Sequence, residues 1–157
     1  MLMFALKTEQ KPALTEFTDR FSKAIDRAWE LSCVDAQDQI RNRIRKVLES
    51  KLLDWEIPNR LRLTYPYLVN RKSLIDNYIK CIDVETRSGN KNEIAVGINE
   101  DRLLSLGLPK YLSDLLEFGN EDIPSFSHLT KGIDDWLISD SKKLFEKLDM
   151  EISKLMR

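Results

Sequence analysis

Glycine, proline, cysteine and histidine are all scarce in this sequence, and their scarcity excludes several classes of protein and of metal site. The 157 residues include five Gly, five Pro, two Cys and one His. A chain with so few turn formers and no low-complexity tract is unlike disordered or fibrous proteins. Cys33 and Cys81 form no CxxC unit, and one histidine cannot complete a Cys/His metal cluster. We therefore expect no metal or other cofactor and two free, buried thiols, with a disulfide between them as the alternative.

Long apolar runs are also lacking. The N-terminal sequence MLMFALK holds an apolar run of six residues, with no basic residue ahead of it and no small cleavage-type residues after it. It is a poor signal peptide and too short to span a bilayer, so we expect no membrane partner. Its length, just before a polar segment, predicts a short β-strand docked on a sheet.

Catalytic motifs are missing as well. The sequence contains no GxGxxG, GxxxxGK[ST], GxSxG or HExxH pattern, which leaves phosphate-binding loops, nucleophile elbows and zincin helices without support. His128 is the only imidazole, and we expect it to be a structural residue at a helix start or on the surface. A small hydrolase that uses His128 with Asp134 or Glu117 is the weakest of the functional hypotheses, and we expect no enzymatic activity.

Helical periodicity is the strongest pattern that the sequence does contain. A stripe at three- and four-residue spacing is formed by Leu14, Phe17, Phe21, Ala24, Ala28 and Leu31. The pattern blurs across 35–38 and resumes at Ile40, so the helix either continues to about Leu53 or bends near the acidic pair, and we expect one long helix or two nearly collinear ones. A second stripe, interrupted by Asp140, predicts a C-terminal helix and is formed by Ile133, Trp136, Leu137, Leu144, Leu148, Ile152 and Leu155.

For the middle of the chain, the sequence predicts an irregular connection, a β-hairpin and a short helix. Two prolines, Pro58 and Pro66, predict an irregular connection over 54–72. Two Ile- and Val-rich runs flank the turn-forming residues 88–91, which predicts a β-hairpin. Pro109 and Gly119 bound a short helix.

Together these elements predict an α+β fold in a single domain over residues 1–157. A small antiparallel sheet, made of the N-terminal strand and the hairpin, packs on the long N-terminal helix, and the C-terminal helix completes the core.

Charge is distributed unevenly along the chain. Residues 41–72 hold nine Lys/Arg against three Asp/Glu, a local charge of +6, whereas residues 99–157 hold eight against twelve, a local charge of −4. Opposite charges on two segments can join copies of a chain head to tail, and a ring results when the rotation closes. Arg41, Arg43 and Arg45 also suggest the alternative of a nucleic-acid-associated or regulatory binding protein that uses 41–72, although a solvated or internally paired helix face explains them better.

One stretch carries a resemblance to a known family. The sequence LEFGNEDIPSF at 116–126, with the order of elements around it, resembles the tail-completion or head–tail joining proteins of tailed bacteriophages. The matching residues are Tyr111, Glu117, Phe118, Gly119, Pro124 and Phe126. The chain departs from the family pattern at Asn120, where Thr is common, and at 70–74, where the family commonly has Thr-Gly-x-Leu.

This resemblance implies a virion structural protein of the bacteriophage neck, assembled in the host cytoplasm. Copies would form a homo-oligomeric ring that joins the portal or connector to the tail terminator or tail tube, with DNA passing transiently through its lumen. Apart from the resemblance, the local pattern of turn formers and aromatic residues predicts that Glu117 is presented at an edge and that Phe118 and Phe126 anchor the loop by burial. The candidate interface residues are Arg41, Arg43, Arg45, Trp55, Tyr65, Tyr67, Tyr111, Glu117, Phe118, Gly119, Pro124 and Phe126.

Overall fold

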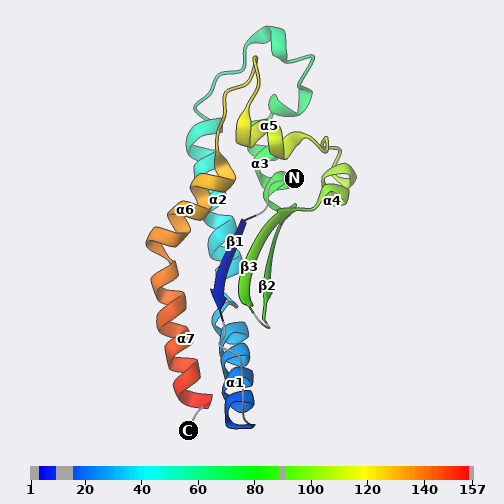
Figure 1. Ribbon diagram of the computed structural model, residues 1–157. Helices are drawn as coiled ribbons and strands as arrows, with labels where there is room; N and C mark the ends of the chain where they lie inside the picture. The colour runs from blue at the N-terminus through cyan, green and yellow to red at the C-terminus, as the bar shows by residue number, and fades with distance from the viewer. Residues whose placement is uncertain (1–3, 10–15, 89–90, 156–157) are drawn as a thin grey trace.

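A computed structural model describes residues 4–9, 16–88 and 91–155. The molecule is elongated, with the sheet at its middle (Figure 1). Loops form one end, and two helices side by side form the other, where the C-terminus also lies. The helices in the described residues are α1 Glu16–Ser32, α2 Ala36–Leu52, α3 Arg71–Ile79, α4 Glu100–Ser105, α5 Leu112–Phe118, α6 His128–Ser139 and α7 Ser141–Leu155. The strands are β1 Phe4–Glu9, β2 Ile82–Arg87 and β3 Lys91–Ile98, and the 3-10 turns are η1 Asn59–Leu61 and η2 Pro66–Leu68.

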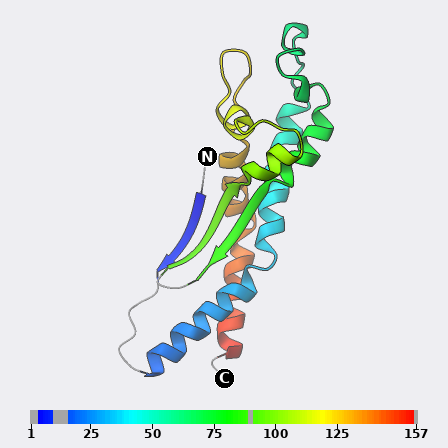
Figure 2. The same cartoon turned by 90° about the vertical axis from the view of Figure 1, so that its right-hand side faces the viewer.

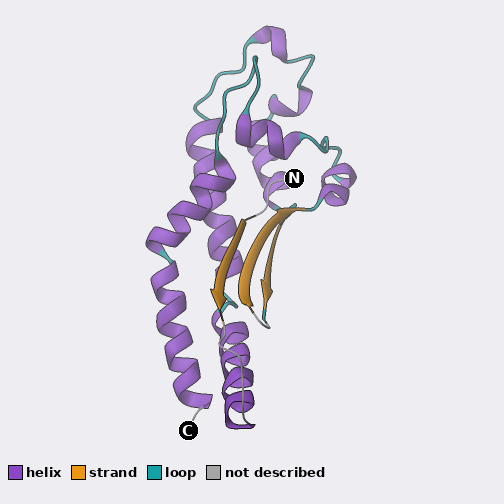
Figure 3. Ribbon diagram, viewed as in Figure 1, coloured by secondary structure: helices purple, strands orange, loops and turns teal. Residues whose placement is uncertain are grey.

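The sheet has three antiparallel strands in the order β1-β3-β2 (Figure 3). β3 pairs with β1 from Phe4↔Val96 to Glu9↔Lys91 and with β2 from Ile82↔Ile98 to Arg87↔Glu93. The predicted N-terminal strand and hairpin are thus confirmed, while Gly89 and Asn90 of the turn lie outside the described residues. The expected apolar face of β3 is also confirmed, because its residues Ile94, Val96 and Ile98 are all buried.

The long N-terminal helix is divided into two. A turn at 33–35 separates α1 from α2, just where the apolar pattern begins to blur. Figure 2 shows that α1 is clearly inclined to α2, so the chain does bend near Asp35, but the expectation of one long helix or two nearly collinear helices is wrong. Ala28 and Trp29 are fully buried at the inner end of α1, whereas Leu14 lies outside the described residues.

The C-terminal helix is interrupted at Asp140, as the sequence predicts. α6 lies along α2, and α7 continues beyond Asp140 to lie beside α1. The Asp140 carboxylate accepts hydrogen bonds from Arg43 Nε at 2.7 Å and Nη2 at 3.1 Å. This two-point contact fixes the junction of α6 and α7 against α2.

Two helices were not foreseen. Residues 71–79 form α3 and residues 100–105 form α4, and both follow an asparagine whose side chain caps the helix. The Asn70 carbonyl oxygen accepts from Ser73 N–H, and that of Asn99 accepts from Arg102 N–H. The irregular connection therefore ends at 70 rather than 72. Likewise, the helix expected to open at Pro109 begins only at Leu112.

Among the described residues, no helix is long and apolar enough to cross a membrane. Cys33 and Cys81 are free and buried, so the thiol prediction is confirmed. Burial raises the pKa of Cys33 to about 12, which keeps its thiol protonated at neutral pH.

Candidate protein-interaction surface

The connection over 54–70 and the loop over 119–127 lie together at the loop end of the molecule (Figures 1 and 2). They are separated by about fifty residues in sequence, yet a series of side-chain contacts joins them. We define the loop-end surface as the exposed residues of these two segments together with Tyr111 and Phe118. The two stretches that the sequence singled out separately thus form one continuous region.

Phenol groups make the first set of contacts. Asn120 Nδ2 donates to the Tyr65 hydroxyl at 3.1 Å, and the hydroxyl oxygens of Tyr67 and Tyr111 lie 3.2 Å apart. The rings of Tyr65 and Tyr67 meet edge to face, with centroids 6.3 Å apart. Burial, with the neighbouring Tyr111 hydroxyl as the next cause, raises the pKa of Tyr67, so the Tyr67 phenol stays neutral and acts as a hydrogen-bonding group.

A second set of contacts holds the far side of the loop. Arg60 Nη1 lies 3.0 Å from Asp122 Oδ1, and Lys51 Nζ donates to the Phe126 carbonyl at 3.2 Å. The Phe126 ring is buried and stacks edge to face on Trp55, with centroids 5.8 Å apart. Phe126 therefore anchors the loop as predicted.

The loop itself depends on Gly119 and Asn120. Gly119 ends α5 with φ +69°, and an added Cβ would stand 2.5 Å from the Ile123 carbonyl oxygen and 2.6 Å from Ser125 N. The Asn120 side-chain oxygen accepts from the N–H groups of Asp122 and Ile123, both at 2.8 Å. Only glycine fits the first position, and Asn120, the departure from the family pattern, closes the turn.

Two expectations about this stretch are wrong. Phe118 is 63 % exposed and so does not anchor the loop, because the last turn of α5 directs it away from the core. Glu117 is only 2 % exposed and is not presented at an edge. Phe118, the next residue in the sequence, faces solvent because successive residues of a helix point about 100° apart.

Glu117 instead caps α6. Its carboxylate accepts from Leu129 N–H at 2.7 Å and from Thr130 N–H at 3.1 Å, and the Thr130 hydroxyl also donates to it. Ser127, the residue before α6, has φ +49° and makes no capping bond with its own side chain. A carboxylate from α5 therefore satisfies the unpaired donors and meets the positive end of the helix dipole.

His128 extends this arrangement into the core. Its Nδ1 lies 3.2 Å from Glu117 Oε2, and its Nε2 lies 2.6 Å from the hydroxyl of Tyr78 on α3. An acid, an imidazole and a hydroxyl in a row could in principle support acid–base chemistry. All three side chains are closed off from solvent, however, so the geometry gives them the structural role of joining α3, α5 and α6. Asp134, the other acid considered with His128, is exposed on α6.

Burial lowers the pKa of His128 to about 3, and the nearby Leu116 backbone opposes this effect only in part. Because the folded pKa lies below the unfolded value of about 6.5, the folded state binds fewer protons between these values. Stability should therefore fall as pH drops below 6.5, by about 1.4 kcal/mol per pH unit and about 2 kcal/mol by pH 5.

Urea unfolding of the wild type and of His128→Gln at pH 7, 6 and 5 tests this, with the slope expected in the wild type only. The range stops at pH 5 so that Asp76 and Asp140, whose carboxyl pKa values are lowered by bonds to Arg45 and Arg43, remain charged. If the free energy of unfolding depended on pH equally in the wild type and in His128→Gln, the pKa of His128 in the folded state would be close to its ordinary value, as in an ion pair with Glu117.

The basic run on α2 is largely engaged within the chain. Arg41 Nε donates to the Ile82 carbonyl at 2.9 Å, Arg43 binds Asp140, and Arg45 Nη1 lies 2.6 Å from Asp76 Oδ1. Part of the positive charge of 41–72 is thus paired within the same copy, as expected for a helix face whose arginines bind acidic neighbours. Fewer of these guanidinium groups remain for phosphate or for a second copy.

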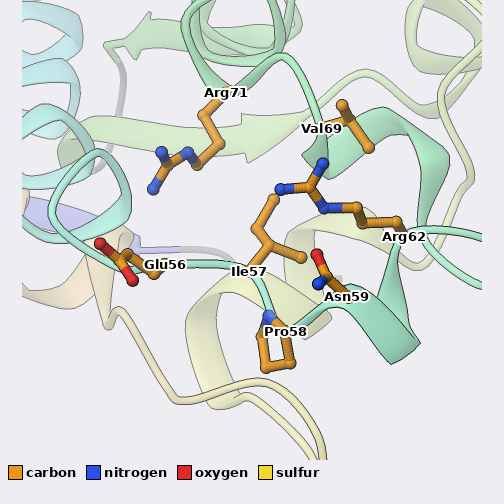
Figure 4. Close-up of a pocket in the computed structure, with 7 residues that line it drawn as sticks. All are labelled: Glu56, Ile57, Pro58, Asn59, Arg62, Val69 and Arg71. Atoms are coloured by element: carbon orange, nitrogen blue, oxygen red, sulfur yellow. The ribbon is translucent and has the colours of Figure 1, made fainter.

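A pocket of about 660 Å³ opens in the connection (Figure 4). Its lining residues are Glu56, Ile57, Pro58, Asn59, Arg62, Val69 and Arg71. Arg71 is held in place, since it donates to the carbonyls of Leu52, Leu53 and Trp55 at the end of α2. The guanidinium of Arg62 extends between the side chains of Ile57 and Val69 (Figure 4), so polar, charged and apolar side chains all line the pocket.

The loop-end surface is rich in exposed apolar side chains that the sequence did not single out. Leu63 is 95 % exposed and Val69 is 51 % exposed, and they join Phe118 and the half-exposed Tyr111. Of the candidate interface residues, Tyr111, Phe118 and Pro124 face solvent, whereas Glu117 and Phe126 are buried and serve the fold. Trp55, Tyr65 and Tyr67 are partly buried between the two segments.

No protein-family model, curated protein or solved structure matches this chain. Within the described ranges, no group of three or more His, Cys, Asp or Glu side chains is placed to hold a metal ion. The loop-end surface combines exposed apolar side chains with a backbone held by internal contacts.

Proposed function

We propose that this chain is a non-enzymatic subunit of a tailed-bacteriophage neck, which assembles as a ring between the portal or connector and the tail. The observation that carries the proposal is the loop-end surface, where Leu63, Val69, Tyr111 and Phe118 are exposed on segments held by internal contacts. Exposed apolar and aromatic side chains on a supported backbone are typical of protein interfaces. The resemblance of 116–126 to neck proteins supplies the biological setting.

The internal contacts make this surface suitable for assembly. Gly119, Asn120 and Phe126 fix the loop, and Tyr65 and Tyr67 fix the connection against it. A surface that is ordered before it binds loses less conformational entropy on association. Assembly into a ring and docking to a neighbour would both benefit from such preorganisation.

The test is assembly of the purified chain, alone and mixed with portal and tail proteins, followed by mass photometry and electron microscopy. The double variant Leu63→Ser with Phe118→Ser should weaken ring formation or docking at least tenfold while circular dichroism stays unchanged. Val34→Ser is the matched control, because Val34 is 64 % exposed in the turn between α1 and α2.

Only monomers in every mixture, or assembly that survives the double variant, would contradict the proposal. The same preparations separate the nucleic-acid alternative. DNA binding that falls steeply with salt and is lost in Arg62→Ala, without any ring, would favour that alternative instead.

A further inference from the structure

Helix α7 carries an apolar stripe that α1 covers only in part. The side facing α1 is marked by Leu144, which is 4 % exposed, and by Glu151, whose side chain is 16 % exposed. Beside it, Phe145 is 39 % exposed and Leu155 is 42 % exposed. Since successive residues advance by about 100° around a helix, Phe145 points roughly a quarter turn away from Leu144. Leu155, eleven residues after Leu144, lies on nearly the same side as Leu144 and is exposed at the end of α7.

The stripe has heptad spacing and is covered only in part, since Leu148 also packs against the core and Ile152 is partly buried. Phe145 and Ile152 are seven residues apart, and Ser141, Leu148 and Leu155 follow the same period at the intervening positions. Alternating three- and four-residue spacing of this kind is what two helices require to interlock their side chains along a seam.

The charges beside the stripe would pair with opposite charges on a second copy of α7 that runs antiparallel to the first. In an antiparallel pair, Phe145 of one helix lies opposite Leu148 of the other, and Ser141 lies opposite Ile152. The same register brings Lys142 next to Asp149 of the second copy, and the twofold symmetry repeats the pair. Lys142 is exposed and makes only a long contact of 3.9 Å with Glu146 of its own helix, and Asp149 is exposed too, so a second copy can reach both side chains.

We propose that α7 pairs with α7 of a second copy of this chain in an antiparallel, twofold-symmetric arrangement, which with the two α1 helices makes a four-helix cluster. This interface lies at the end of the molecule opposite the loop-end surface (Figure 1) and does not depend on the neck function. The charge pairing selects the antiparallel direction.

The interface is modest in size. α7 has fifteen residues and is about 22 Å long, so the pair buries less than the roughly 1,200–2,000 Å² of standard complexes. Association should therefore depend on concentration. Sedimentation equilibrium from about 1 to 500 μM covers the range expected of a weak dimer, and the wild type should shift from 18.4 kDa to twice that mass.

Charge variants test the pairing directly. In a dimer of Lys142→Glu, residue 142 of each copy would place an acid next to Asp149 of the other copy. In a dimer of Asp149→Lys, residue 149 of each copy would place a lysine next to Lys142 of the other copy. Each variant alone should therefore dimerise at least tenfold more weakly than the wild type. A mixture of the two variants should recover a dimer, because both cross-copy pairs become complementary. A wild type that stays monomeric, or a mixture no stronger than its components, overturns the proposal.

Apolar variants test the stripe. Phe145→Ser should abolish the dimer, whereas Met150→Ser, at an exposed position on the opposite side of α7, should leave it unchanged. Since Phe145 is partly exposed, the monomer is expected to stay folded, which circular dichroism checks. Equal dimerisation of these two variants would also overturn the proposal, whatever the outcome of the ring assay.

Discussion

Glu117→Ala should lower the free energy of unfolding by roughly 3–5 kcal/mol. The change removes two backbone hydrogen bonds and one hydroxyl bond to a buried charge, each worth about 1.5–3 kcal/mol before relaxation. It also leaves the first turn of α6 without any side-chain cap, because Ser127 supplies none. Urea denaturation at pH 7 followed by circular dichroism measures the loss.

Two further variants show that the effect comes from the cap. Glu117→Gln keeps the shape and one acceptor oxygen, so it should lose about half as much stability. Glu121→Ala removes an exposed carboxylate four residues away and should change stability by no more than about 0.5 kcal/mol. If Glu117→Ala unfolded at the wild-type urea concentration but failed to assemble, Glu117 would be an interface residue after all.

Gly132→Ala should lower the free energy of unfolding by roughly 2–4 kcal/mol, although alanine is the better helix former by about 1 kcal/mol. α6 approaches α2 so closely that an added Cβ would stand 2.6 Å from Ile44 Cγ1, 2.8 Å from Ile44 Cα and 2.9 Å from Ile44 N. Backbone atoms cannot rotate away, so the two helices would have to separate. Thermal and urea unfolding measure the loss.

Gly97→Ala is the matched control for this change. An added Cβ at Gly97 meets no atom within 4 Å, so the substitution should be close to neutral. A Gly132→Ala protein as stable as the wild type would mean that α6 shifts along α2 without loss of packing.

Local patterns in the sequence were enough to predict much of the fold. The spacing of Phe21, Ala24 and Ala28, the turn formers at 88–91 and the interruption at Asp140 each act over a few residues. The α+β class and the three-stranded sheet followed from them and are confirmed. Helices α3 and α4 were missed because they are short and their main signal is an asparagine cap, which also occurs in turns.

The candidate site was predictable only in part. Composition drew attention to the tyrosines of 54–70 and to 116–126, and the structure brings these together. Composition could not show which side chains are buried. Glu117 and Phe118 are adjacent, yet one caps a helix inside the core and the other faces solvent.

The sequence alone determined most of the elements of this protein, α3 and α4 excepted, since helix stripes, strand alternation and glycine turns result from interactions between near neighbours in the chain. The tertiary structure alone decided which charges are free. Arg43 meets Asp140 across 97 residues, and His128 meets Tyr78 across 50. Such pairs depend on how helices pack, and packing depends on the shapes of both surfaces at once, such as the gap that Gly132 leaves for Ile44.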